Sequence, residues 1–272
     1  MPTFYAEVED CEIVDDKLNF ILDYDNVIQY QNGKKQSKLK VTYGEMIDGM
    51  ANNKSIETLI SEIEADPTQT VTLTQNYDAS YLKTTGNAVI NTIFRGTLDG
   101  NGYKITGLNK PLFDTVENAT IQNLVLEDVT LVGANSRGSI ANTAQNTNVQ
   151  NVHIRGINMT TGSDGSAGMV GVFQSGTIEK SSVTDFHIKL NHIRIAAIIG
   201  KAIGSRVSNC YVEGNMESIT STKDGVGGII GDVHEAQTTT IENCIAKVNF
   251  VNNTRAKNNG GILGLSRDNN TI

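Results

Sequence analysis

A short sequence signature recurs along most of the chain at intervals of 28, 28, 29, 29, 34 and 31 residues. It consists of small or polar residues, one aliphatic residue and often a following x-Asn. The aliphatic positions are Ile93, Ile121, Val149, Ile178, Val207, Ile241 and Ile272. Self-similarity at a period of about 20 to 50 residues is typical of stacked structural units. The chain is therefore expected to be a stack of repeats.

A second signature, a pair of small residues, two mostly apolar residues and then Gly, follows within each unit. Its copies are AGMVG, AAIIG, GGIIG and GGILG, ending at Gly171, Gly200, Gly231 and Gly264. Between the two signatures, segments such as IQNLVLEDVTL alternate apolar and polar residues, which predicts strands with one buried face. One such unit cannot bury its own apolar face, whereas stacked units can. The sequence predicts an all-β, right-handed parallel β-helix with coils about 4.8 Å apart.

Two columns of equivalent residues are expected to run along the stack. An asparagine ladder, hydrogen-bonded from coil to coil, is predicted from Asn123, Asn151, Asn209 and Asn243. Lys180 interrupts it in the middle unit. Cys210 and Cys244 take the next position, which Leu124 and Val152 fill in earlier units, so both thiols are predicted to fill the core. A strained disulfide or a reactive pair is the alternative.

Residues 51–70 are predicted to form a helix that caps the coils of residues 71–272. The apolar residues follow the i, i+3, i+4, i+7 spacing of an amphipathic helix at Ile56, Leu59, Ile60 and Ile63. Asn53 or Ser55 is the expected N-cap, and Pro67 ends the helix. The segment from Gln69 to Leu73 is the expected first strand.

Residues 1–50 differ in character and are predicted to be a small antiparallel β element or linker. Asn32-Gly33 between short alternating runs is a hairpin signal. The acidic residues of this region lack the D-x-D-x-D-G spacing of a calcium loop, so a solvated face is the preferred interpretation.

The glycine-rich stretch FRGTLDGNGYKITGL, from Phe94 to Leu108, invites comparison with phosphate-binding loops. Its glycine spacing matches neither the dinucleotide fingerprint nor the P-loop, and the alternating residues after Gly102 favour a strand over a helix. We interpret its glycines as turn and close-packing positions. A net charge of −8 argues against nucleic-acid partners. No apolar run approaches the roughly 18 residues of a membrane span.

Two candidate chemical sites are weak. His234-Glu235 begins like a zinc-binding H-E-x-x-H motif, but Thr238 stands where the second His is needed. Asp128 and Asp185 occupy equivalent positions two coils apart, a separation of roughly 9.6 Å. That is near the upper end of the roughly 6.5–9.5 Å range of inverting glycosidases.

The residue between the two aspartates in the predicted column is Gly156, and the next equivalents are Gly214 and Val248. A single pair of carboxylates, with no cluster of basic residues beside it to bind an acidic sugar, is expected by chance. No catalytic, cofactor-binding or metal-binding residue is therefore predicted in this chain.

The sequence resembles a known family in several motifs taken together. F-x-G-T-L-D-G-N-G-Y-x-I-x-G-L, P-L-F-D, A-T-I-Q-N-L-V-L, G-G-I-I-G and G-G-I-L-G are similar to the GLUG-type repeats of immunoglobulin A-cleaving zinc metalloproteases of streptococci. The resemblance covers roughly residues 50 to 272 and concerns the N-terminal region of those enzymes.

The resemblance implies that the parent protein is a large secreted or wall-attached zinc metalloendopeptidase that acts on a host glycoprotein such as immunoglobulin A, as a virulence factor. Its zinc would lie in a catalytic domain outside this chain, and the coils would be a non-catalytic scaffold beside that domain. The final Asn270-Thr271-Ile272 looks like the start of another coil, so a chain truncated at its C-terminus is expected. The alternative is a surface adhesin or binding module built from the same repeats without a protease domain.

Overall fold

The computed structural model describes residues 8–14, 17–22, 55–83, 86–133, 137–218, 223–234, 237–251 and 256–266. The chain divides into two units, Met1–Lys54 and Ser55–Ile272. In the first unit, β1 (Val8–Val14) and β2 (Lys17–Leu22) pair antiparallel, as predicted for an element before the coils. The hairpin predicted at Asn32-Gly33 lies outside the described residues.

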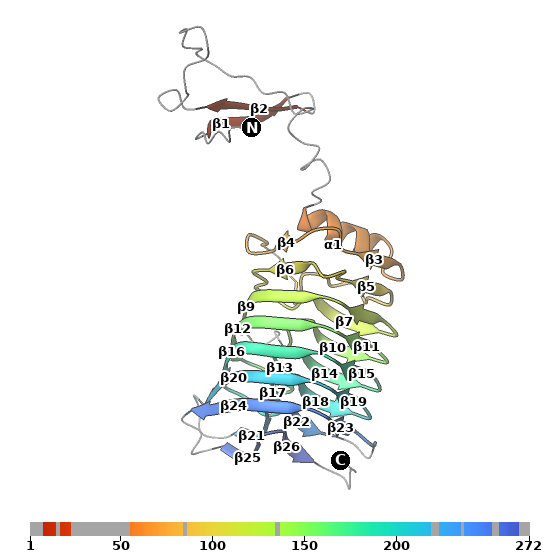
Figure 1. Ribbon diagram of the computed structural model, residues 1–272, viewed down its shortest axis with the longest axis vertical. Helices are drawn as coiled ribbons and strands as arrows, with labels where there is room; N and C mark the ends of the chain where they lie inside the picture. The colour runs from red at the N-terminus through yellow and green to blue at the C-terminus, as the bar shows by residue number, and fades with distance from the viewer. Residues whose placement is uncertain are drawn as a thin grey trace. The chain divides into compact units, whose positions relative to one another are not determined.

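The second unit is a right-handed parallel β-helix whose strands form four parallel sheets, as predicted (Figure 1). Sheet 1 contains β7 (Phe113–Glu117), β10 (Ala141–Gln145), β14 (Val170–Gln174), β18 (Ile199–Ile203), β22 (Ile230–Val233) and β26 (Leu263–Ser266). Sheet 2 contains β3 (Thr70–Thr72), β5 (Thr97–Asp99), β8 (Thr120–Gln122), β11 (Asn148–Gln150), β15 (Thr177–Glu179), β19 (Arg206–Ser208) and β23 (Thr240–Glu242).

The other two sheets complete each coil. Sheet 3 contains β4 (Tyr77–Asp78), β6 (Lys104–Thr106), β9 (Val125–Gly133), β12 (His153–Thr161), β16 (Ser182–Leu190), β20 (Tyr211–Ser218) and β24 (Ile245–Val251). Sheet 4 contains the short β13 (Ser166–Ala167), β17 (Ile195–Ala196), β21 (Lys223–Gly227) and β25 (Ala256–Gly260). The chain passes through sheets 4, 1, 2 and 3 in each full coil.

The core is a set of columns of inward-facing apolar side chains. In sheet 2 the column consists of the buried Val71, Leu98, Ile121, Val149, Ile178 and Val207, followed by the partly buried Ile241. Burying one such side chain stabilises the fold by about 1.5–3 kcal/mol. In β24 the inward-facing Ala246, Val248 and Phe250 are only partly buried.

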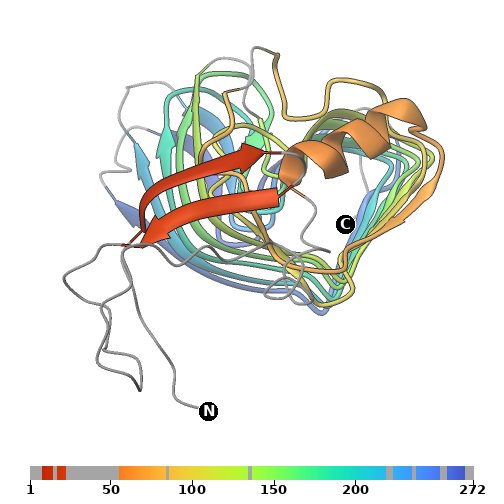
Figure 2. The same ribbon diagram turned by 90° about the horizontal axis from the view of Figure 1, so that it is seen from above.

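Helix α1 (Ile56–Ala65) covers the first coil, as the sequence predicts (Figure 2). Ser55 is the N-cap, and its side chain accepts a hydrogen bond from the Thr58 N–H. Ile56, Leu59 and Ile63 are buried in the same core cluster as the coils. No helix in the part of the chain that the structure describes is long and apolar enough to cross a membrane.

The glycine signature marks the place where sheet 4 lies directly against sheet 1. A Cβ added to Gly200 would stand 2.5 Å from both the Gly165 carbonyl carbon and the Ser166 backbone nitrogen. A Cβ on Gly231 would likewise stand 2.5 Å from the Ile195 backbone nitrogen, and one on Gly171 would stand 2.7 Å from the Asn142 carbonyl oxygen. These glycines let two backbones touch, which is why the same residue recurs in successive coils.

The predicted asparagine ladder occupies the corner between sheets 2 and 3, where the backbone is left-handed. The positive φ values lie between 51° and 55° for Asn123, Asn151, Lys180, Asn209 and Asn243. The Asn151 side-chain amide donates to the Asn123 side-chain oxygen at 2.9 Å. Asn tolerates this conformation better than other residues with a side chain, so the corner explains the column more fully than stacking alone.

Candidate functional site

The glycine-rich motif that resembles a ligand loop is a turn built around Asp99. The Asp99 carboxylate accepts hydrogen bonds from the Gln122 amide at 2.7 Å, the Asn123 amide at 3.1 Å and the Asn101 N–H at 2.8 Å. Burial opposes ionisation of Asp99, but these hydrogen bonds outweigh it and lower its pKa. Asp99 therefore ties its turn to the next coil.

The paired aspartates, Asp128 and Asp185, lie in a second left-handed column. Their φ values are +55° and +54°, and the intervening Gly156 has a φ of +70°. Both side chains are exposed. Asp, like Asn and Gly, suits this conformation, so the column supplies a reason for these residues that involves no chemistry on a sugar.

The predicted equivalence of Gly214 with Asp185 is wrong by one residue. The register between β16 and β20 shifts after Thr184, so Asp185 is an extra, bulged residue and Gly214 lies opposite Phe186. A Cβ on Gly214 would lie 2.6 Å from the Phe186 ring. Gly214 is a close-packing position, and the column of aspartates ends at Asp185.

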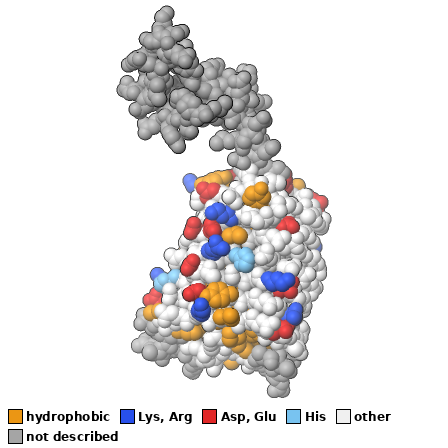
Figure 3. Space-filling model, in the orientation of Figure 1, with side chains coloured by type: hydrophobic (Ala, Val, Ile, Leu, Met, Phe, Trp, Pro, Cys, Tyr) orange, Lys and Arg blue, Asp and Glu red, His pale blue; other side chains and the backbone are white. Residues whose placement is uncertain are grey.

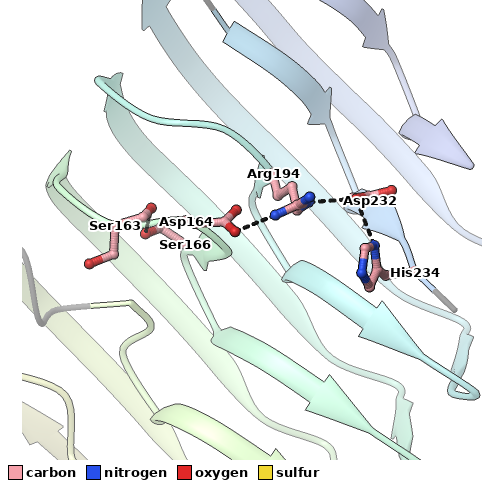
Figure 4. A network of polar contacts seen from close by, with 6 residues as sticks. All are labelled: Ser163, Asp164, Ser166, Arg194, Asp232 and His234. Atoms are coloured by element: carbon pink, nitrogen blue, oxygen red, sulfur yellow. Dashed lines mark hydrogen bonds and ion pairs between the residues drawn. The ribbon is translucent and has the colours of Figure 1, made fainter. Parts of the chain in front are cut away.

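A bridging arginine, Arg194, which no sequence motif singles out, joins three coils (Figure 4). It precedes β17 at φ +58°, where the neighbouring coils have Gly165 and Gly225. Its Nε donates to Asp232 Oδ2 at 2.7 Å, and its Nη1 pairs with the Asp164 carboxylate. The signal in the sequence was an arginine at a position that is otherwise glycine.

The Arg194 network is mostly shielded from water. The Asp232 side chain is fully buried, and that of Arg194 is 15% exposed. His234, the residue of the apparent zinc motif, places Nδ1 3.5 Å from Asp232 Oδ2 (Figure 4). Its neighbour Glu235 lies outside the described residues. One guanidinium between carboxylates of the preceding and following coils acts as a clamp, and its loss would leave buried negative charge.

The two cysteines are in contact at equivalent corners of consecutive coils. Cys210 is buried and Cys244 is partly buried, and both are free thiols, as expected for core fillers. The hydrogen bond between the thiols, followed by burial, raises the pKa of Cys210. The same bond lowers the pKa of Cys244 to about 7. Cys244 is also the less buried member of the pair.

The outer side of sheet 3 concentrates charged and aromatic groups. We define the sheet 3 face by the outward-pointing side chains of Lys104, Glu127, His153, Arg155, Tyr211 and Lys247. Figure 3 shows basic, acidic and His side chains interleaved where Figure 1 draws β9, β12, β16 and β20. Their spacing is fixed because each comes from a strand in register with its neighbours.

Contacts within the sheet 3 face order its side chains. Glu127 pairs with Lys104 at 2.7 Å and with Arg155 at 3.8 Å. Lys247 lies 5.4 Å from the centre of the Tyr211 ring, within cation–π range. Burial, followed by the Arg155 charge, lowers the pKa of His153. The face offers both charges and an aromatic ring in a fixed array.

A shallow groove of about 400 Å³ crosses the corner between sheets 1 and 2. The left-handed corner residues change from Asn118 and Asn146 to Ser175 and Gly204 along the stack, and this loss of side-chain atoms hollows the surface. Hydroxyl and amide groups line much of the groove. In the described part of the chain, no group of three or more His, Cys, Asp or Glu residues is arranged to hold a metal ion.

The fold and these surfaces define a parallel β-helix with arrays of outward side chains. The chain belongs to the family described as the M26 IgA1-specific metallo-endopeptidase N-terminal region, whose model matches residues 21–156. This agrees with the family resemblance recognised in the sequence.

Individual relatives agree with this assignment. The chain is 34% identical over 181 residues to an immunoglobulin A1 protease of Streptococcus sanguinis, covering 62% of the chain and 9% of the relative. It is 30% identical over 190 residues to the zinc metalloprotease ZmpC of Streptococcus pneumoniae, covering 66% of the chain and 10% of the relative. The chain thus spans about a tenth of the length of these relatives.

A solved structure of an IgA1 protease shares the fold. It superposes with a TM-score of 0.58 at 17% identity and covers 95% of this chain and 24% of its own. At this identity the likeness shows the fold alone.

Proposed function

We propose that this chain is a non-catalytic, substrate-engaging scaffold of a secreted or cell-surface zinc metalloendopeptidase. The observation that supports it best is the sheet 3 face, where strands in register hold charged and aromatic side chains in a fixed array. Side chains already ordered before binding lose less entropy when a partner docks. The zinc and the residues that hydrolyse the peptide bond would lie elsewhere in the parent protein.

The proposed partner is a host protein, with immunoglobulin A1 as the first candidate because relatives are immunoglobulin A1 proteases. Outside the cell, the chain would bind this host protein while the catalytic domain of the parent protein cleaves it. Mixed charges and a tyrosine favour a protein partner, because protein interfaces are enriched in Tyr and Arg.

Binding can be measured by surface plasmon resonance with the chain immobilised and purified immunoglobulin A1 in solution. The double variant Arg155→Glu/Lys247→Glu should bind about 2- to 30-fold more weakly, because each exposed charge contributes about 0.2–1 kcal/mol. Ser175→Asn is the matched control in the groove, where Asn fits the corner as Asn146 does. Equal binding by the double variant and the wild type would exclude the sheet 3 face, and no binding by either would exclude this partner.

The adhesin alternative is separated by an experiment on the parent protein. Deleting whole coils from an active protease should raise KM for the protein substrate and leave cleavage of a short peptide unchanged, because the scaffold contacts only the larger substrate. A parent that lacks an H-E-x-x-H motif and cleaves no protein, yet binds through these coils, would instead be an adhesin.

A further inference from the structure

Cys210 and Cys244 meet the geometric requirements of a disulfide bond. They directly precede Tyr211 and Ile245, which are paired residues of β20 and β24. The Ile245 N–H donates to the Cys210 carbonyl at 2.9 Å, so the two cysteines stand side by side in adjacent coils. Neighbouring strands lie about 4.8 Å apart, within the Cα separation of roughly 4.4–6.8 Å that disulfides span.

The column that contains the cysteines does not by itself need thiols. Ser181 occupies the same position one coil earlier, and its hydroxyl donates to the Glu179 carbonyl at 2.8 Å. Cys210 and Cys244 make the same bond, to the Ser208 and Glu242 carbonyls, both at 3.3 Å. A serine hydroxyl could make this hydrogen bond at each corner, so the bond does not explain why cysteine occurs in two consecutive coils. Two adjacent thiols can, in addition, form a disulfide.

We propose that Cys210 and Cys244 form an intrachain disulfide that clasps two consecutive coils when a low-molecular-weight disulfide such as oxidised glutathione is present. The Cys244 thiolate attacks one glutathione sulfur, forming a mixed disulfide and releasing one glutathione. The Cys210 sulfur then attacks the Cys244 sulfur, forming the new bond and releasing the second glutathione. Two protein thiols lose two protons and two electrons, and one glutathione disulfide becomes two thiols.

The test uses the folded chain with Cys11→Ser, which leaves only this pair of thiols. After equilibration with oxidised glutathione, thiol titration should fall to zero, and peptide mapping without reductant should join the Cys210 and Cys244 peptides. The disulfide should raise the Tm of the oxidised chain by about 5–10 °C relative to the reduced chain. Hydrogen exchange of the β24 amides should slow, and reductant should reverse both effects.

The matched control adds Cys210→Ser, which keeps the corner bond that Ser181 makes in its own coil. It should fold, form no intrachain link and show no rise in Tm with oxidant. The proposal is overturned if both thiols of the folded chain stay free, if only links between chains form, or if the oxidised chain is no more stable than the reduced one. Because none of these readouts involves substrate, they test the clasp separately from the proposed scaffold role.

Discussion

Replacing Lys180 with Asn is expected to stabilise the coils, because Lys180 is the one non-Asn residue in the described ladder. Its φ of +51° lies in the left-handed region, which costs an ordinary L-residue roughly 1–2 kcal/mol and Asn less. Asn151 and Asn123 show that amides in this column reach each other, at 2.9 Å. One further exposed amide bond contributes about 0.5 kcal/mol. Lys180→Asn should therefore add about 1.5 kcal/mol to the free energy of unfolding.

The measurement is urea unfolding followed by circular dichroism, with thermal melts in parallel. For a unit of this size, about 1.5 kcal/mol corresponds to a rise in Tm of about 3–6 °C. Lys180→Gly separates the two contributions, because it relieves the backbone penalty without adding an amide, and Lys180→Ala retains the penalty. If Lys180→Asn is no more stable than Lys180→Ala, the explanation of the ladder by its backbone conformation is incorrect.

Three further substitutions test other contacts. Gly200→Ala should lower Tm by more than 5 °C in a thermal melt, because its Cβ would meet backbone at 2.5 Å, whereas Gly102→Ala, with open space around it, should lose only about 1 kcal/mol from its positive φ. Asp99→Ala should reduce the loss of unfolding free energy on acidification, measured by urea unfolding at several pH values. The lowered pKa of Asp99 gives stability that is present above its unfolded pKa of about 3.9 and lost as the pH falls through the folded value. Arg194→Met should cost about 3–5 kcal/mol in the same assay because the buried Asp232 loses its cation, and an unchanged midpoint would contradict the clamp.

The sequence was sufficient to predict the parallel stack, the capping helix and the recurring columns, because each depends on local periodicity. The alternation along segments such as β9 and the period of the signatures fix which residues face inward. The N-cap at Ser55 and the first strand, β3, also follow from local sequence patterns.

The features that the sequence left open depend on contacts across coils. The bulge at Asp185 shifts the register only in β20, and a sequence period of 29 residues hides it. The bridge from Arg194 joins Asp164 and Asp232, which are far apart in the chain and share no motif. The left-handed backbone at the corners could not be predicted directly, because the sequence shows only that Asn recurs there and gives no φ angle.

Apart from the bulge at Asp185, the length differences among the repeats lie between the paired strands, and this makes the coil a unit that can be copied. Ile195 pairs with Val226 and Arg206 pairs with Thr240, intervals of 31 and 34 residues, whereas Thr177 and Arg206 are 29 apart. The extra residues lie outside the paired strands. A duplication of one whole coil would keep every column in register and lengthen the rod by about 4.8 Å. Gene duplication could thus adjust the reach of such a protein in small, equal steps without redesigning its core.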